Sequence, residues 1–160
     1  MSILNEETLK IIDHWCSKYP ATQRRSAVLA SLTAAQKQNR GWLNAELMDA
    51  VADYLGIPKV QVYEVATFYD MYDLKEAGEH KIRLCTNVSC MLNGCDKIAD
   101  HLKQKLGIGF GETTRDGKFT LKEAECLAAC CGAPMMQVDL EYHEKLTPEK
   151  VDEILANVKN

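Results

Sequence analysis

Residues 81–90 read KIRLCTNVSC, and residues 125–139 read ECLAACCGAPMMQVD. The first stretch begins as a predicted strand over Lys81–Cys85, and the second follows another predicted strand over Lys118–Ala124. Each strand leads into a loop of small or polar residues that carries two cysteines, spaced C-x4-C in the first loop and C-x3-C in the second. Such loops let the backbone wrap around a bulky group, so the pattern predicts a metal centre at the ends of two strands.

The segments around these loops predict alternating strands and helices. A helix is expected over residues 93–106, a glycine-rich loop over 107–117, and two further strands over 135–138 and 140–143. Thr147 and Pro148 are typical of the cap and first position of a last helix. The order of these elements favours an α/β sandwich of thioredoxin-like size over residues 80–160.

The N-terminal half predicts four helices. Asn5 and Asn44 are expected to cap the first and third, the second is expected over residues 24–38, and Pro58 is expected in the first turn of the fourth. A polar segment over residues 75–80 is expected to link the two halves. The fold class is therefore α+β, with a helical bundle over residues 1–74 followed by the thioredoxin-like domain. The side chains expected to face inward from the second helix are Val28, Leu29, Leu32 and Ala35.

Composition excludes several classes of protein. The chain has 160 residues, of which 46% are hydrophobic and 26% charged, as in ordinary globular proteins. No apolar run approaches the roughly 18 residues of a membrane span, and the acidic N-terminus does not resemble a secretion signal, so we expect a cytoplasmic chain without direct membrane insertion. The net charge of −4, with no basic excess in either half, argues against a nucleic-acid partner.

Six of the seven cysteines lie between residues 85 and 131, which indicates metal or redox chemistry in a cytoplasmic protein. A binuclear iron–sulfur cluster requires four thiolates, two for each iron. Zinc is the competing metal, since the two spacings are compatible with it, although zinc knuckles more often use C-x2-C. The spacing favours the cluster over zinc and over a set of buried free cysteines, one or two of which are still expected.

Other motifs favour structural interpretations. The glycines of GIGFG at residues 107–111 follow a helix instead of opening one, unlike a dinucleotide-binding loop. No histidine pair and no nucleophile with a neighbouring base are visible, so we expect no catalytic residues. Residues 41–80 carry 2 basic and 8 acidic side chains, which favours a docking bundle over a helix-turn-helix. Five aromatic residues have helical spacing and are expected in the core, with partner contact as the alternative: Tyr54, Tyr63, Phe68, Tyr69 and Tyr72.

Three stretches resemble a known family. They are GWLNAELMDAVADYLGIPKVQVYEVATFYDMY at residues 41–72, CTNVSC at 85–90, and ECLAACCGAPMMQVD at 125–139 followed by LTPEKVDEIL at 146–155. The second half is similar to the thioredoxin-like [2Fe-2S] ferredoxins. The whole chain resembles the NuoE-type members of that family, which belong to respiratory complex I, NADH:quinone oxidoreductase.

The resemblance implies a set of cluster ligands. The ligand positions of the family fall on Cys85, Cys90, Cys126 and Cys130. Two further cysteines depart from the family pattern. Cys95 stands where relatives commonly have small residues, and Cys131 directly follows a ligand and could replace Cys130 in a C-x4-C pair. The seventh, Cys16, lies on the apolar face of a helix and is expected in the core.

The resemblance also implies a function. An iron–sulfur cluster transfers single electrons, so a flavin must split the hydride of NADH, and no flavin site is visible here. The family implies one [2Fe-2S] cluster that exchanges an electron with FMN on a NuoF-like, NADH-binding flavoprotein subunit, in the peripheral arm of complex I at the inner membrane. Two alternatives stay open. One is the equivalent subunit of an NAD-linked hydrogenase or formate dehydrogenase, and the other is a zinc-stabilised interaction module without redox function.

Overall fold

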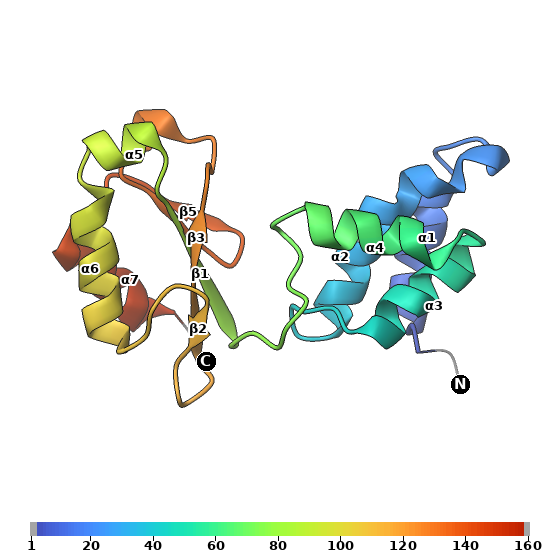
Figure 1. Cartoon of the computed structure of the whole chain (residues 1–160), viewed down its shortest axis with the longest axis horizontal. Helices are drawn as coiled ribbons and strands as arrows, with labels where there is room; N and C mark the ends of the chain where they lie inside the picture. Colours follow the sequence, from blue (N-terminus) through green and yellow to red (C-terminus); the bar gives the residue numbers. More distant parts are fainter. Residues whose placement is uncertain (1–2, 159–160) are drawn as a thin grey trace. The chain divides into compact units, whose positions relative to one another are not determined.

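The computed structural model describes residues 3–158 and divides into two compact units, with the boundary between Glu76 and Ala77 (Figure 1). The first unit is helical, and the second combines helices with a five-stranded sheet. The predicted α+β fold class is therefore confirmed. Within residues 3–158, no helix is both long enough and apolar enough to cross a membrane.

From residue 3 onward, the first unit contains four α-helices and one 3-10 helix. The cap predictions at Asn5 and Asn44 are confirmed, since their side chains accept hydrogen bonds from the backbone N–H groups of Thr8 and Leu47, both at 2.8 Å. Gly56 ends the third α-helix in the left-handed conformation, with φ +67°. The elements are α1 (Glu6–Cys16), η1 (Ala21–Ala27), α2 (Val28–Gln38), α3 (Ala45–Leu55) and α4 (Lys59–Phe68).

The second helix differs from the sequence-based expectation. Its first turns form the 3-10 helix η1, interrupted at Gln23 by non-helical backbone, so the α-helix begins only at Val28. Leu29 is 41% exposed, and the expectation that it faces inward is wrong. The buried stripe of α2 advances by steps of three and four residues from Val28, and Leu29 lies about a quarter turn from it.

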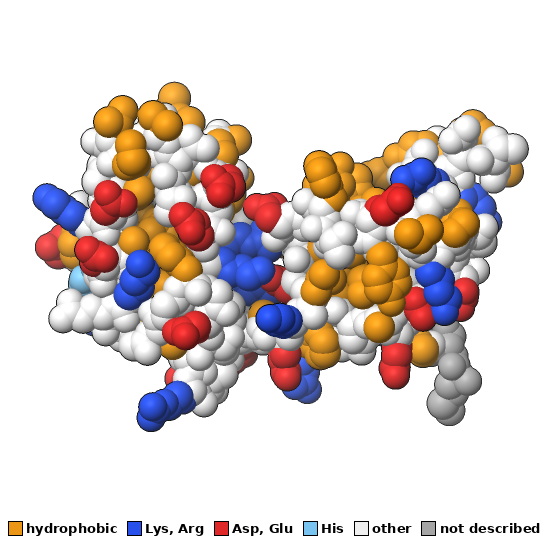
Figure 2. Space-filling view, in the orientation of Figure 1, with side chains coloured by type: hydrophobic (Ala, Val, Ile, Leu, Met, Phe, Trp, Pro, Cys, Tyr) orange, Lys and Arg blue, Asp and Glu red, His pale blue; other side chains and the backbone are white. Residues whose placement is uncertain are grey.

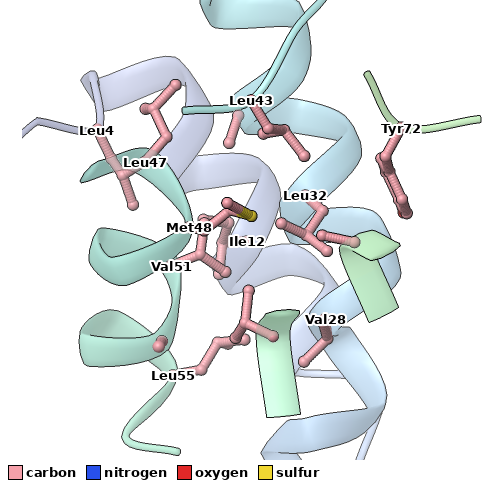
Figure 3. Packing of buried hydrophobic residues seen from close by; sticks show 14 of the residues in the cluster. Leu4, Ile12, Val28, Leu32, Leu43, Leu47, Met48, Val51, Leu55 and Tyr72 are labelled. Carbon is pink, nitrogen blue, oxygen red and sulfur yellow. The ribbon is translucent and has the colours of Figure 1, made fainter. Parts of the chain in front are cut away.

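Side chains from all four α-helices meet in one hydrophobic core (Figure 3). Leu32 of α2 and Ile12 of α1 are fully buried there, together with Val51 of α3. Burial of this much apolar surface is what holds the helices of the unit together. The residues labelled in the figure are Leu4, Ile12, Val28, Leu32, Leu43, Leu47, Met48, Val51, Leu55 and Tyr72.

The aromatic residues of this unit do not share one environment. Tyr72 is buried, and its hydroxyl donates a hydrogen bond to the Leu29 carbonyl at 2.8 Å. Tyr54 and Tyr63 are partly buried against the core, as predicted. Phe68, at the end of α4, is 80% exposed, and Tyr69 is exposed beside it, so the core prediction is wrong for these two.

The second unit is built on a sheet with the strand order β2-β3-β1-β4-β5. The central strands β1 and β3 are parallel, and the other neighbouring strands are antiparallel. The elements in chain order are β1 (His80–Cys85), α5 (Val88–Leu92), α6 (Cys95–Leu106), β2 (Glu112–Thr113), β3 (Phe119–Ala124), η2 (Cys130–Gly132), β4 (Met136–Val138), β5 (Glu141–His143) and α7 (Pro148–Asn157).

One face of the sheet is covered by helices. Figure 1 shows α6 and α7 on the same side of the strands, and the two helices pack against each other. In β1, the buried Ile82 and Leu84 alternate with the half-buried Lys81 and Arg83, so the apolar side chains point to the helices and the polar ones to the other face. Residues of this core include Ile98, Leu102, Leu121, Met136, Val138, Val151 and Leu155.

Two short elements were not predicted. The helix expected over residues 93–106 is α6, which begins at Cys95 after Gly94 in the left-handed conformation, with φ +85°. The short helix α5, over Val88–Leu92, precedes it and was not expected. The glycine-rich loop contains the strand β2, which pairs with β3. Gly107 ends α6 and Thr147 caps α7, as predicted.

Only a short segment connects the two units. Asp73 is fixed to the first unit, since its backbone N–H donates to the Gln36 side chain at 2.8 Å and its carbonyl accepts from Leu43 at 2.7 Å. Gly78 is fixed to the second unit, because its N–H donates to the Thr120 hydroxyl at 2.6 Å. Residues 74–77 lie between these two anchored positions. The chain can therefore be truncated within this segment without removing either set of hydrogen bonds.

Candidate metal centre

The strand register brings both cysteine pairs to one edge of the sheet. Cys85 is the last residue of β1 and lies opposite Ala124, the last residue of the parallel strand β3. The carboxyl ends of parallel neighbours meet at the same edge, so Cys126 follows its strand close to where Cys85 ends its own. The returning chain also reaches this edge, since the N–H of Cys85 donates to the Met135 carbonyl at 3.2 Å.

The first pair is buried. Cys85 and Cys90 are 4% and 2% exposed and pack with Met135, and the short helix α5 carries Cys90 back over the end of β1. Burial, with a hydrogen bond between the Cys90 thiol and Cys85 that favours the protonated form, raises the pKa of the Cys90 thiol to about 11. A metal ion bound there must therefore displace a proton that the thiol otherwise holds firmly.

The second pair lies in an exposed loop. Cys126 follows β3, and Cys130 begins the 3-10 turn η2. Ala128 between them adopts the left-handed conformation, with φ +56°, which costs a residue with a side chain roughly 1–2 kcal/mol. This conformation directs the N–H of Ala128 to the Cys126 sulfur at 3.3 Å. The loop thus supplies the N–H···S contact that stabilises a thiolate ligand.

The other three cysteines have different surroundings. Cys95, at the start of α6, is fully buried in the same cluster as Cys85 and Cys90. Burial and the nearby Asp96 carboxylate raise the pKa of its thiol. Cys131 is exposed beside Cys130, and Cys16 is half-buried against the helical core, in agreement with its predicted location. The proximity of Cys95 to the first pair was not evident from its spacing in the sequence.

The four proposed ligands share an edge but do not converge in this structure. Within residues 3–158, no three His, Cys, Asp or Glu side chains lie close enough together to hold a metal ion. The first pair is in contact and buried, whereas the second pair is exposed. The ligand assignment therefore stays a proposal, supported by the register and by the loop conformations.

Apolar side chains surround the end of the unit that carries the cysteines. On α5, Val88, Met91 and Leu92 are 60%, 49% and 77% exposed, and Figure 2 shows hydrophobic side chains gathered over this end. Residues 125–139 contain no lysine or arginine. An exposed apolar surface beside a site is typical of an interface with another protein.

Residues 12–159 match the model of a known protein family, described as the thioredoxin-like [2Fe-2S] ferredoxins. The chain belongs to this family. The E subunit of NADH-quinone oxidoreductase from Rickettsia bellii is 44% identical in sequence to this chain. The match covers 98% of this chain and 93% of the Rickettsia subunit. Its counterpart from Rickettsia conorii is 42% identical over the same shares. Flavoprotein 2 of mitochondrial NADH dehydrogenase [ubiquinone] from Dictyostelium discoideum is 43% identical over 97% of this chain, which spans 63% of that relative.

Solved structures share the fold of this ferredoxin. Two crystal structures of an NAD+-reducing [NiFe]-hydrogenase, air-oxidised and H2-reduced, superpose with TM-scores of 0.67 and 0.68. Each match covers 80% of the present chain at 19% sequence identity, but only 23% and 22% of the hydrogenase chains. At this identity the likeness shows the fold alone.

The residues of this ferredoxin fit the cluster that its family implies. The fit rests on the available donor atoms. The sulfurs come from four residues that follow or end the strands at one sheet edge, and the Ala128 N–H donates to one of these sulfurs; the four residues are Cys85, Cys90, Cys126 and Cys130. Thiolates are the ligands that iron–sulfur clusters use, and four suffice for one [2Fe-2S] cluster. When bound, such a cluster supplies one-electron transfer. The chain itself contributes burial of Cys85 and Cys90, the strained Ala128 turn, and the apolar surface of α5.

Proposed function

We propose that this chain is the iron–sulfur subunit of an NADH-quinone oxidoreductase of the complex I type. In this proposal, Cys85, Cys90, Cys126 and Cys130 hold one [2Fe-2S] cluster, which exchanges one electron with FMN on an NADH-oxidising flavoprotein partner. The observation that carries it is the match of the whole chain, at 44% identity, to the E subunit of an NADH-quinone oxidoreductase. NADH and FMN belong to the partner, since a cluster takes one electron and not a hydride.

The exposed residues at the end of the second unit that carries the cysteines support electron transfer to a docked partner. The exposed turn that holds Cys126 and Cys130 places two of the proposed ligands at the surface. Val88, Met91 and Leu92 on α5 supply apolar surface next to them. A partner that covers this surface would exclude water and bring its flavin to the ligand loops.

The helical unit is proposed as a second docking surface. We assign residues 1–74 this role because their apolar core is complete, yet Phe68 and Val60 are still exposed on α4. The surrounding segment, residues 41–80, carries 8 acidic and 2 basic side chains, so a partner with basic groups around an apolar patch is complementary to it. In the proposed assembly the chain lies in the peripheral arm, on the cytoplasmic side of the inner membrane.

The alternatives differ in what supports them. The hydrogenase structures resemble the chain in fold only, whereas relatives with more than twice that sequence identity are components of NADH-quinone oxidoreductase. This contrast favours complex I over a hydrogenase or formate dehydrogenase. A zinc-stabilised module would need the same four thiolates, and it is the alternative that metal analysis distinguishes.

Electron exchange with the flavoprotein can be measured directly. The chain is reduced anaerobically with dithionite, freed of dithionite, and mixed with NAD+ and an FMN-containing NADH-oxidising subunit. We expect the visible absorption of the oxidised cluster to return, with about one NADH formed for two clusters because a hydride carries two electrons. A partner stripped of FMN is the control and should leave the cluster reduced. Reoxidation at the same rate without FMN would contradict the proposal.

A further inference from the structure

Residues 144–146 form a backbone strap that is hydrogen-bonded to the segment directly after Cys130. The N–H of Lys145 donates to the Gly132 carbonyl at 2.6 Å, and the N–H of Leu146 donates to the Pro134 carbonyl at 2.9 Å. Lys145 adopts the left-handed conformation to do so, with φ +50°. The strap follows directly after β5, so the sheet fixes one end of it.

The strap presents one carboxylate to the cysteine turn. The backbone of Glu144 is also bound by α7, because the Lys150 ammonium donates to the Glu144 carbonyl at 2.6 Å. The Glu144 side chain lies directly over Gly132, and a methyl group on Gly132 would overlap its carboxyl group. Gly132 closes the turn η2, which begins at Cys130. A side chain at position 132 would therefore have to displace the Glu144 carboxylate from this place.

We propose that Glu144 lowers the reduction potential of the cluster by holding a negative charge against the turn of Cys130, and that Gly132 makes room for that charge. The inference rests on the proposed function, since it uses Cys130 as a ligand. Reduction adds a negative charge to the cluster, and a nearby carboxylate raises the energy of the reduced state more than that of the oxidised state. Residues 125–139 contain no basic side chain, and Lys150, which contacts the Glu144 backbone carbonyl, is present in both the wild type and a Glu144 variant, so it does not enter their difference.

The expected effect is modest because Glu144 is exposed and its charge is screened by salt. Glu144→Gln keeps the shape of the side chain and removes the charge. We expect the equilibrium constant for reduction to rise about threefold, which for a one-electron couple is about 30 mV at 59 mV per tenfold change. The measurement is an anaerobic redox titration of the full chain, followed by visible absorption and electron paramagnetic resonance (EPR).

The chain offers a matched control in β5, the strand that leads into the strap. Glu141 is also exposed, but it pairs with Val138, which lies opposite Ile82, three residues before the end of β1. Glu141→Gln removes the same charge farther from the cysteine edge, and we expect it to leave the potential unchanged. The difference in reduction potential between the wild type and Glu144→Gln should also become smaller in about 1 M salt, where charges are screened over about 3 Å. A shift caused by altered packing would persist in salt.

A second variant moves the charge instead of removing it. Gly132→Ala should displace the Glu144 side chain and raise the potential in the same direction, and it serves as the test should Glu144→Gln fail to hold a cluster. A cluster-containing Glu144→Gln or Gly132→Ala protein with the wild-type potential would overturn the inference, as would an equal shift in Glu141→Gln. A wild-type protein without iron would instead overturn the ligand assignment of the proposed function.

Discussion

Alanine at Cys126 should abolish the visible absorption of the purified protein. Each iron of a binuclear cluster takes two thiolates, and the loss of one leaves an iron with an open position. The same loss is expected for Cys85, Cys90 and Cys130. Cys126 gives the clearest result, because its side chain is exposed and its removal leaves no cavity in the core. The measurement is the absorption spectrum of anaerobically purified protein, with iron content per chain.

Cys131→Ala is the matched control for this prediction. Cys131 is the neighbour of Cys130 in the same turn and is also exposed, so its substitution disturbs the loop to a similar degree. We expect the Cys131, Cys95 and Cys16 variants to keep a spectrum close to that of the wild type. A Cys131 variant that loses the cluster while a Cys130 variant keeps it would transfer the ligand role to Cys131.

Removal of the helical unit should separate docking from cluster binding. A chain of residues 77–160 keeps the anchor of Gly78 on Thr120 and the complete core between the sheet and its helices. We expect it to retain its colour but to bind the flavoprotein partner about 10²–10⁴-fold more weakly, since two linked binding surfaces become one. Copurification and a titration of the partner measure this loss.

Point variants in the intact chain test the docking surface without removing the whole helical unit. Phe68→Ala removes a largely exposed aromatic ring from α4, in the unit that carries none of the proposed ligands. It should weaken association in the same direction, whereas Leu140→Ala, an exposed leucine next to β5, should not. A truncated domain that still copurifies with the flavoprotein at full stoichiometry would show that the docking role assigned to residues 1–74 is wrong.

Elements with local signals were predictable from the sequence. Asn5, Asn44 and Thr147 cap helices because their side chains accept from the first free N–H groups, an interaction within three residues of the cap. Long helices such as α3 and α6 have enough turns to display a period. By contrast, α5 has 5 residues and β2 has 2, which are too few for a period to be visible.

Other features depend on packing between distant segments. Phe68 and Tyr72 both continue the apolar pattern of α4, but only Tyr72 reaches a partner across the bundle, the carbonyl of Leu29. In the metal centre, the spacing of the cysteines predicted two loops, and the resemblance supplied the ligand set. The parallel register of Cys85 and Ala124, which places both loops at one edge, comes only from the fold. The contact of Glu144 with Gly132 joins positions 12 residues apart and has no sequence signature.

The metal and sulfide content of the full chain, purified without oxygen, tests the proposed cluster most directly. We expect about two irons and two acid-labile sulfides per chain, together with an EPR signal of about one unpaired spin after reduction with dithionite. A colourless protein that contains about one zinc per chain, and no iron or sulfide, would contradict the cluster and with it the proposed electron transfer.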